Sequence, residues 1–156
     1  MTTPQEAQSK HHHVWLAMLS AAMLAGIAFW PALRAGITPE DFGWLVAARQ
    51  LDSPWPFIAG NPFFVYFYRP APLVLWWLSG QVFADHAIAH NALDLALHVL
   101  NASLIARVAW RISGRVSAAW TAGLAFACLP CAAGTALWMS DRFDPVALTF
   151  GLSALL

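Results

Sequence analysis

The chain has 156 residues, of which 60% are hydrophobic and only 10% are charged, and its formal net charge is zero. This composition leaves too little polar surface to cover a water-soluble globule, so it predicts an integral membrane protein. It also excludes nucleic acid as a partner, because no basic stripe is present that could meet a phosphate backbone. The placement of the eight Lys and Arg residues, rather than their total, then indicates the orientation in the membrane.

Residues 1–13 are polar, and we expect them to form a disordered cytoplasmic tail. The histidines His11 to His13 could bind a metal, but without a fourth ligand nearby a polar flank or a cloning remnant is the simpler interpretation. The apolar run from Val14 to Trp30 predicts a first span over about residues 14–33, an uncleaved anchor rather than a signal peptide. Lys10 places the N-terminus in the cytoplasm, so the chain after this span lies outside.

Residues 34–86 form the predicted external loop, which is rich in prolines and in aromatic residues that prefer the headgroup boundary. Within it, Thr38 is a suitable N-cap for a helix that begins at Pro39. Glu40 and Asp41 fall in the first turn of that helix, where the helix dipole favours acids. The two acids therefore have two interpretations, helix capping or a catalytic role on the external side.

Residues 70–84 are apolar but number only about 15, which suits an interfacial helix better than a span. Residues 87–106 are long enough to cross, and they lead into one short loop that holds Arg107, Arg111 and Arg115. Loops with such a positive cluster stay in the cytoplasm. If residues 70–84 also crossed, the three arginines would lie outside, so we expect this segment to lie on the outer interface.

Residues 118–139 carry no charge and return outward, with an expected kink at Pro130. The chain emerges at residues 140–144 and re-enters at residues 146–156, an apolar run of eleven residues, about half of the roughly 20 that a span needs. We therefore expect an N-terminal fragment of a longer protein of the inner or plasma membrane. The predicted fold class is an all-α membrane protein, a multi-spanning helical bundle whose external loop carries interfacial helices.

A polar stripe follows one face of the second predicted span. Asn91, Asp94, His98 and Asn101 fall at i, i+3, i+7 and i+10, and His90 and His98 both lie four residues from Asp94. Polar residues at membrane depth face protein or water rather than lipid. The stripe could line a polar path, but hydrogen bonds between helices explain it equally well, and we favour that structural interpretation, with Asp94 as its most important member.

Three stretches resemble motifs of the GT-C superfamily of membrane glycosyltransferases, and the nearest branch is the protein O-mannosyltransferase type. Residues 138–144, Trp-Met-Ser-Asp-Arg-Phe-Asp, are similar to the family's Trp-Ile-Ser-Gly-Arg-x-Asp, and residues 68–70 to its aromatic-Arg-Pro. The stripe keeps the last two members, His98 and Asn101, of a His-x-x-Asn-x-x-x-His-x-x-Asn pattern. Asp141 replaces the glycine of the first motif, and Asn91 and Asp94 replace the first two members of the stripe pattern. Phe126, Ala127 and Pro130 also match a Phe-Ala-x-His-Pro turn of the family, but Leu129 stands in place of the histidine and Gly134 where an acid often follows.

The resemblance implies transfer of a sugar from a polyprenyl-phosphate donor to a protein, glycan or lipid acceptor on the external or periplasmic face. It implies that an acid of the first external loop is the catalytic base, for which we favour Asp41 over Glu40, and that Arg69 and Arg142 hold the donor phosphate. The chemistry requires both groups, because the acceptor hydroxyl loses a proton and the leaving phosphate gains charge. Supporting roles fall to Asp94, His98, Asn101, Ser140 and Asp144.

Other functions stay open on the sequence. A non-catalytic transporter or assembly subunit would use the polar stripe as a path through the membrane. A purely structural scaffold would need only the helix-capping and helix-packing roles described above for these residues. The sequence predicts no metal ligands and leaves open whether transfer requires a divalent cation. A donor site built from later spans would be missing, so we expect this fragment by itself to be inactive.

Overall fold

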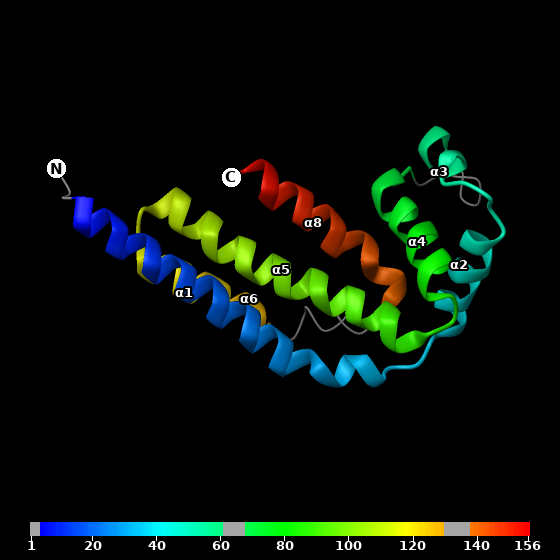
Figure 1. Cartoon of the computed structure of the whole chain (residues 1–156), viewed down its shortest axis with the longest axis horizontal. Helices are drawn as coiled ribbons and strands as arrows, with labels where there is room; N and C mark the ends of the chain where they lie inside the picture. Colours follow the sequence, from blue (N-terminus) through cyan, green and yellow to red (C-terminus); the bar gives the residue numbers. More distant parts are fainter. Residues whose placement is uncertain (1–3, 61–67, 130–137) are drawn as a thin grey trace.

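The computed structural model of the chain describes residues 4–60, 68–129 and 138–156. The described residues are helical and include no strand, which confirms the all-α prediction (Figure 1). The predicted kink at Pro130 and the family position at Gly134 lie outside the described residues. In chain order the elements are α1 (Pro4–Phe29), η1 (Trp30–Arg34), α2 (Pro39–Arg49), α3 (Trp55–Ala59), α4 (Pro70–Phe83), α5 (Ala87–Ser113), α6 (Val116–Ala127), η3 (Met139–Arg142) and α8 (Phe143–Ala154).

The helices α1, α5, α6 and α8 lie along the long axis of the molecule, and α2, α3 and α4 gather at one end (Figure 1). The helices along the long axis alternate in direction. α1 and α6 run toward the end that holds α2 to α4, and α5 and α8 run away from it (Figure 1). α5 is the central helix, because it packs against α1, α6 and α8.

Small residues let α1, α5 and α6 approach closely. Their shared core consists of buried alanines, namely Ala17, Ala21, Ala25, Ala102, Ala106, Ala119 and Ala127. Gly123 of α6 lies where a Cβ atom would come within 2.8 Å of the Ala106 Cβ atom and 3.1 Å of the Ala21 Cβ atom. Packing through small side chains is typical of helices that associate in a membrane.

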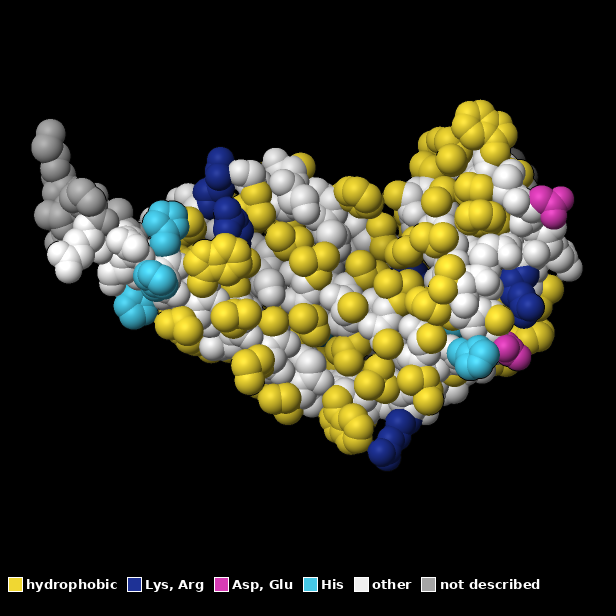
Figure 2. All heavy atoms as spheres, in the orientation of Figure 1, with side chains coloured by type: hydrophobic (Ala, Val, Ile, Leu, Met, Phe, Trp, Pro, Cys, Tyr) yellow, Lys and Arg dark blue, Asp and Glu magenta, His cyan; other side chains and the backbone are white. Residues whose placement is uncertain are grey.

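In the part of the chain that the structure describes, two helices are long and apolar enough to cross a membrane, Gln8–Arg34 and Ala87–Ser113. Large apolar side chains of the first, Leu16, Leu19, Met23 and Ile27, are between 51% and 67% exposed. Hydrophobic side chains cover much of the molecular face in Figure 2. An apolar surface of this kind is unfavourable in water and is accommodated by hydrocarbon.

The N-terminal segment differs from the prediction. α1 begins at Pro4, so residues 4–13 are helical, and the prediction of a disordered tail is wrong for them. No proline stands between Pro4 and Pro31, and the intervening Glu, Ala, Gln and Lys residues are strong helix formers. The apolar helix therefore continues backward into the polar segment.

The observed helices of the predicted loop and of the second predicted span agree more closely with the prediction. α2 begins at Pro39 behind a Thr38 N-cap, as predicted, and α4 covers nearly the whole of the segment predicted as a helix. α5 extends to Ser113, beyond the predicted end at Ala106. Gly114 ends it with φ +67°, a conformation that glycine adopts without strain.

Candidate functional site

Asp41 holds the start of α2 and joins it to η3. Its side chain is 1% exposed. One carboxylate oxygen, Oδ2, accepts hydrogen bonds from the backbone N–H (3.0 Å) and hydroxyl (2.8 Å) of Thr38, which completes a capping box. The other, Oδ1, accepts from the backbone N–H (2.7 Å) and hydroxyl (2.6 Å) of Ser140. Both oxygens are therefore bonded within the chain.

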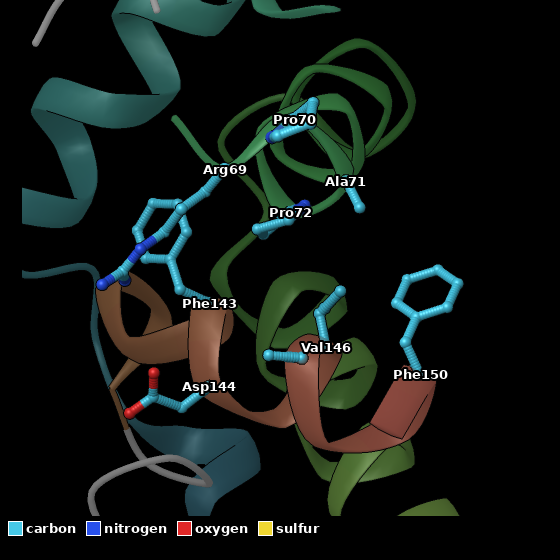
Figure 3. Close-up of a pocket in the computed structure, with 9 residues that line it drawn as sticks. Arg69, Pro70, Ala71, Pro72, Phe143, Asp144, Val146 and Phe150 are labelled. Atoms are coloured by element: carbon cyan, nitrogen blue, oxygen red, sulfur yellow. The ribbon is translucent and has the colours of Figure 1, made fainter. Parts of the chain in front are cut away.

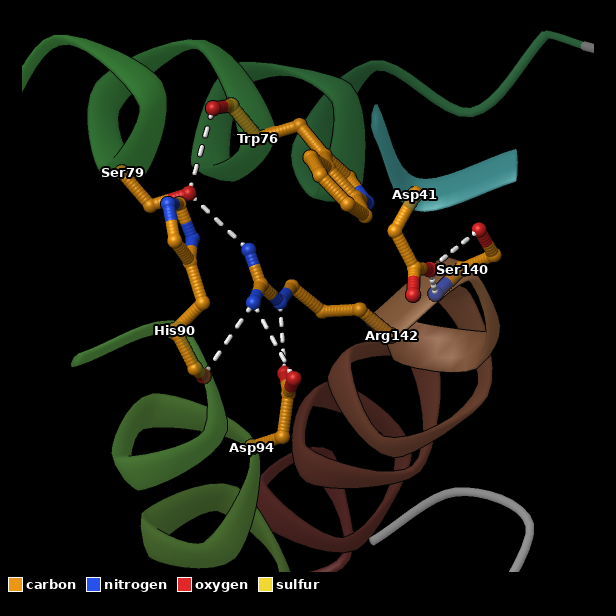
Figure 4. A network of polar contacts seen from close by, with 7 residues as sticks. All are labelled: Asp41, Trp76, Ser79, His90, Asp94, Ser140 and Arg142. Carbon is orange, nitrogen blue, oxygen red and sulfur yellow. Dashed lines mark hydrogen bonds and ion pairs between the residues drawn. The ribbon is translucent and has the colours of Figure 1, made fainter. Parts of the chain in front are cut away.

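Arg142 lies at the centre of a second, deeper network (Figure 4). It is fully buried, and its Nε and Nη2 atoms donate to the Asp94 carboxylate at 2.5 and 3.1 Å. Nη1 donates to the Ser79 hydroxyl at 2.9 Å, and Nη2 also donates to the His90 carbonyl at 3.3 Å. The guanidinium lies 4.6 Å from the centre of the Trp76 ring. Arg142 thus ties η3 to α4 and α5.

The rest of the polar stripe bonds to neighbouring helices. Asn91 donates to the Ala35 carbonyl at 2.7 Å, and Asn101 donates to the Pro145 carbonyl at 2.9 Å. The His98 ring lies between Phe29 and Phe126, at centroid distances of 4.7 and 5.2 Å. These contacts fit the interpretation of the stripe as a set of helix–helix hydrogen bonds and packing contacts.

An open pocket lies beside these networks, between the start of α4 and the first two turns of α8 (Figure 3). Its volume is about 380 Å³. Arg69 stands at its polar end, with its guanidinium 5.4 Å from the centre of the Phe143 ring, and Asp144 stands nearby. The opposite wall is apolar and is formed by Pro70, Ala71, Pro72, Val146, Ala147 and Phe150. One pocket therefore combines a cation, a carboxylate and a hydrophobic wall.

The two charged residues at the polar end of this pocket, Arg69 and Asp144, also act on Asp141, which does not line it. The pKa of the Asp141 carboxyl is raised above its ordinary value, first by partial burial, and then by the charge of Asp144 and a hydrogen bond to it. The positive charge of Arg69 opposes this increase. Asp141, Asp144 and Arg69 therefore form one electrostatic group.

The structure brings the predicted site residues together in three neighbouring pairs, Asp41 with Ser140, Asp94 with Arg142, and Arg69 with Asp144. Glu40 is exposed in the first turn of α2 and does not line the pocket, and His98 and Asn101 lie farther along α5. The sequence did not single out Ser79 or Trp76, which contact Arg142. The only local signal is that Ser79 is a polar residue in a mostly apolar helix, and nothing in the sequence distinguishes Trp76 from its neighbour Trp77.

Among the described residues, no group of three or more His, Cys, Asp or Glu side chains could hold a metal ion. Comparison of the chain with protein-family models, with curated proteins and with solved structures gives no match. The geometry of the site is therefore the basis for a proposed function.

Proposed function

We propose that this chain is part of a multi-pass membrane glycosyltransferase that moves a sugar from a polyprenyl-phosphate donor to a hydroxyl acceptor. The observation that carries the proposal is the pocket beside Arg69, where a guanidinium stands at one end of an apolar wall. A polyprenyl phosphate has the matching form, an anionic phosphate attached to a long hydrocarbon. Arginine binds phosphate through paired charge-assisted hydrogen bonds, and the apolar wall would receive the first isoprene units.

The alternating directions of α1, α5, α6 and α8 support a multi-pass arrangement in the membrane (Figure 1). In this arrangement the end with α2, α3 and α4 lies at the external or periplasmic face, and the junction of α5 and α6, with Arg111 and Arg115, lies in the cytoplasm. The pocket then opens at the external headgroup boundary. A lipid-linked donor could enter it from the bilayer without leaving the hydrocarbon.

In the proposed reaction an acceptor oxygen attacks the anomeric carbon of the sugar and the bond from that carbon to the phosphate oxygen breaks. The electron pair of that bond stays on the phosphate, whose charge Arg69 stabilises. The acceptor proton passes to a carboxylate, and the geometry favours Asp144 for this role because it is exposed and lines the pocket. Asp41, the base predicted from the sequence, is buried and bonded, so we assign it the positioning of η3 through Ser140.

Arg142 was the second arginine predicted to hold the phosphate. Arg142 is fully buried and does not line the pocket, whereas Arg69 stands at the polar end of the pocket, so we place the donor phosphate on Arg69 instead. The polar stripe offers no comparable support for transport, because Asp94 is paired with Arg142 and Asn101 is bonded to α8.

Photo-crosslinking tests the donor site. The chain is reconstituted in vesicles with a polyprenyl phosphate that carries a photoreactive group near its phosphate. We expect crosslinks to residues 143–150, reduced at least about tenfold by Arg69→Gln, because one charge-assisted contact contributes roughly 1.5–3 kcal/mol. The matched control is Arg34→Gln, which removes an exposed arginine that stacks on Trp30 at 4.9 Å. Equal crosslinking by the Arg69 variant and the wild type would refute the pocket as the phosphate site.

Transfer of a radiolabelled sugar from the lipid-linked donor, measured in a longer protein that includes this chain together with any later spans, tests the base separately. We expect Asp144→Asn to lower the rate of transfer by about 10²-fold or more without reducing donor crosslinking. Asp41→Asn should lower the rate only as far as it lowers the folded fraction. Loss of transfer in a fully folded Asp41→Asn protein, with normal transfer by Asp144→Asn, would return the role of base to Asp41.

A further inference from the structure

The charged residues divide unevenly between the two ends of the molecule. The end formed by the start of α1 and the end of α5 holds four cations, Lys10, Arg107, Arg111 and Arg115, which we call the basic collar, and one acid, Glu6. The remainder of the chain holds four arginines and seven acids. The acidic side chains visible in Figure 2 lie at the end opposite the histidines of α1.

Contacts between α1 and α5 hold the collar together. The Arg107 guanidinium lies 5.9 Å from the centre of the Trp15 ring, and the His11 ring packs edge-on against Trp110 at a centroid distance of 5.0 Å. The cations of both helices are therefore fixed around the same end. They do not depend on a long loop for their placement.

The chain itself supplies little negative charge to the collar arginines. Among the described residues, the ion pairs join Asp85 with His86 and Asp94 with Arg142, and neither includes a collar arginine. Arg107 and Arg111 are four residues apart on one helix, where like charges repel. The dipole of α5 stabilises Arg111 in its last turn, but Arg115 is the N-cap of α6, where the dipole disfavours a cation. The described part of the chain therefore leaves the collar arginines available to anions from outside the chain.

The neighbours of the collar indicate the source of that charge. Trp15 is half-exposed, Trp110 and Trp120 are partly exposed, and exposed apolar side chains of α1 begin directly after Trp15. Tryptophan prefers the boundary between headgroups and hydrocarbon. The order along α1 is thus cation, tryptophan, then apolar stripe, which places the cations at the depth of lipid phosphates.

We propose that the basic collar is a binding surface for the headgroups of anionic phospholipids. The arginines bind the headgroup phosphates, and Trp15 and Trp110 bracket the glycerol region beneath them. This interaction is separate from sugar transfer, because the collar lies at the end of the long helices opposite the Arg69 pocket (Figure 1). Substitutions in the collar should therefore leave donor binding unchanged, and substitutions at Arg69 should leave phospholipid binding to the collar unchanged.

Native mass spectrometry of the chain in neutral detergent, titrated with phosphatidylglycerol or phosphatidylcholine, tests the proposal. We expect the wild type to bind phosphatidylglycerol at least about fivefold more tightly than phosphatidylcholine. Each basic residue near an anionic surface contributes about a fivefold preference, so Arg107→Gln/Arg111→Gln should weaken phosphatidylglycerol binding about tenfold or more. A second test needs only the wild type: raising the salt concentration should reduce its preference for phosphatidylglycerol over phosphatidylcholine.

The matched control is Arg34→Gln/Arg49→Gln at the opposite end. It removes the same charge and likewise includes one arginine stacked on tryptophan. We expect it to keep the preference, and Arg107→Lys/Arg111→Lys should keep most of it. Circular dichroism verifies equal helix content in every variant. An absent preference in the wild type, or an equal loss in the Arg34/Arg49 variant, would overturn the proposal.

Discussion

Arg142 is the buried residue on which the packing of the site most depends. Its charge is balanced by the carboxylate of Asp94, and both side chains are inaccessible to solvent. Removing one partner of such a pair leaves the other charge buried and uncompensated, which costs about 3–5 kcal/mol. We therefore expect Arg142→Gln and Asp94→Asn each to lower the free energy of unfolding by about this amount, measured by reversible unfolding in mixed micelles.

The double variant Asp94→Leu/Arg142→Met is the control for this pair, because it removes both charges and keeps apolar volume. Its loss of stability should be clearly smaller than the sum of the two single losses. Arg49→Gln, at an exposed arginine, should change stability by less than about 0.5 kcal/mol. Additive losses in the double variant would show that the two charges are not coupled.

Asp141 predicts a dependence of stability on pH. Its pKa is raised in the folded state, so the folded state binds the proton more tightly than the unfolded state does. The stabilisation from this proton is present below the unfolded pKa and is lost as the pH rises through the folded pKa. Asp141→Asn should therefore be more stable than the wild type at neutral pH.

This advantage of the Asn variant should shrink as the pH falls through the raised pKa, because the wild-type carboxyl then becomes neutral as well. Unfolding titrations at several pH values measure the difference. Asp85→Asn, at an exposed acid, is the control and should show no such advantage. A constant difference between Asp141→Asn and wild type across the pH range would contradict this interpretation.

Local sequence was enough to predict the cap of α2, because Thr38 and Asp41 are three residues apart and their hydrogen bonds close within one turn. It was not enough to predict what Asp41 and Arg142 contact elsewhere. Ser140 is 99 residues from Asp41, and Asp94 is 48 residues from Arg142. Such contacts depend on how the helices pack against one another, which cannot be predicted from hydrophobic periodicity or from capping rules.

At the level of helices, Gly123 allows α6 to approach α1 and α5 closely. A Cβ atom at this position would lie 2.8 Å from the Ala106 Cβ atom, so Gly123→Ala forces the helices apart. We expect a loss of about 1–3 kcal/mol in the free energy of unfolding, the usual effect of overpacking. The control is Gly26→Ala in α1, where no atom lies within 4 Å of the added Cβ, and alanine should be neutral or stabilising by up to about 1 kcal/mol. Equal effects of the two substitutions would contradict close packing at Gly123.

The existence of the helices was more predictable than their ends. Apolar length and Pro39 and Pro70 at first positions indicated α2 and α4, because proline fits the first turn of a helix. The end of α5 was missed because the arginines after Ala106 were assigned to a loop. Arginine is a good helix former, and the helix ends where Gly114 adopts a left-handed conformation.

For the whole molecule, the uneven distribution of charge could be predicted from the sequence. A count of arginines predicts that residues 107–115 and the predicted loop lie on opposite sides of a membrane. In the structure these segments lie at opposite ends of the molecule (Figure 1). The pocket beside Arg69 could not be predicted in the same way. It forms where α4 meets α8, and segments about 75 residues apart in sequence must pack together to create it.

The position of α4 decides the topology of the protein in the membrane. α4 has 14 residues, fewer than the roughly 20 that a span needs, and it packs against α2 and α3 at the end of the molecule. If it lies on the interface, the loops before and after it share one side of the membrane. The loop after α5 then lies on the other side.

Single cysteines at three exposed positions test this arrangement after Cys128 and Cys131 are replaced by serine. We expect an impermeant maleimide added from outside to label Asp52→Cys and Asp85→Cys and to leave Ser113→Cys unlabelled until the membrane is permeabilised. Replacing Ser113, rather than the nearby Arg111, leaves the charge of the basic collar unchanged. If α4 crosses the membrane instead, positions 52 and 113 will react from the same side and position 85 from the other. That pattern would place Arg69 and Asp144 on opposite sides of the membrane, which is incompatible with one pocket lined by both, and would refute the proposed site of transfer.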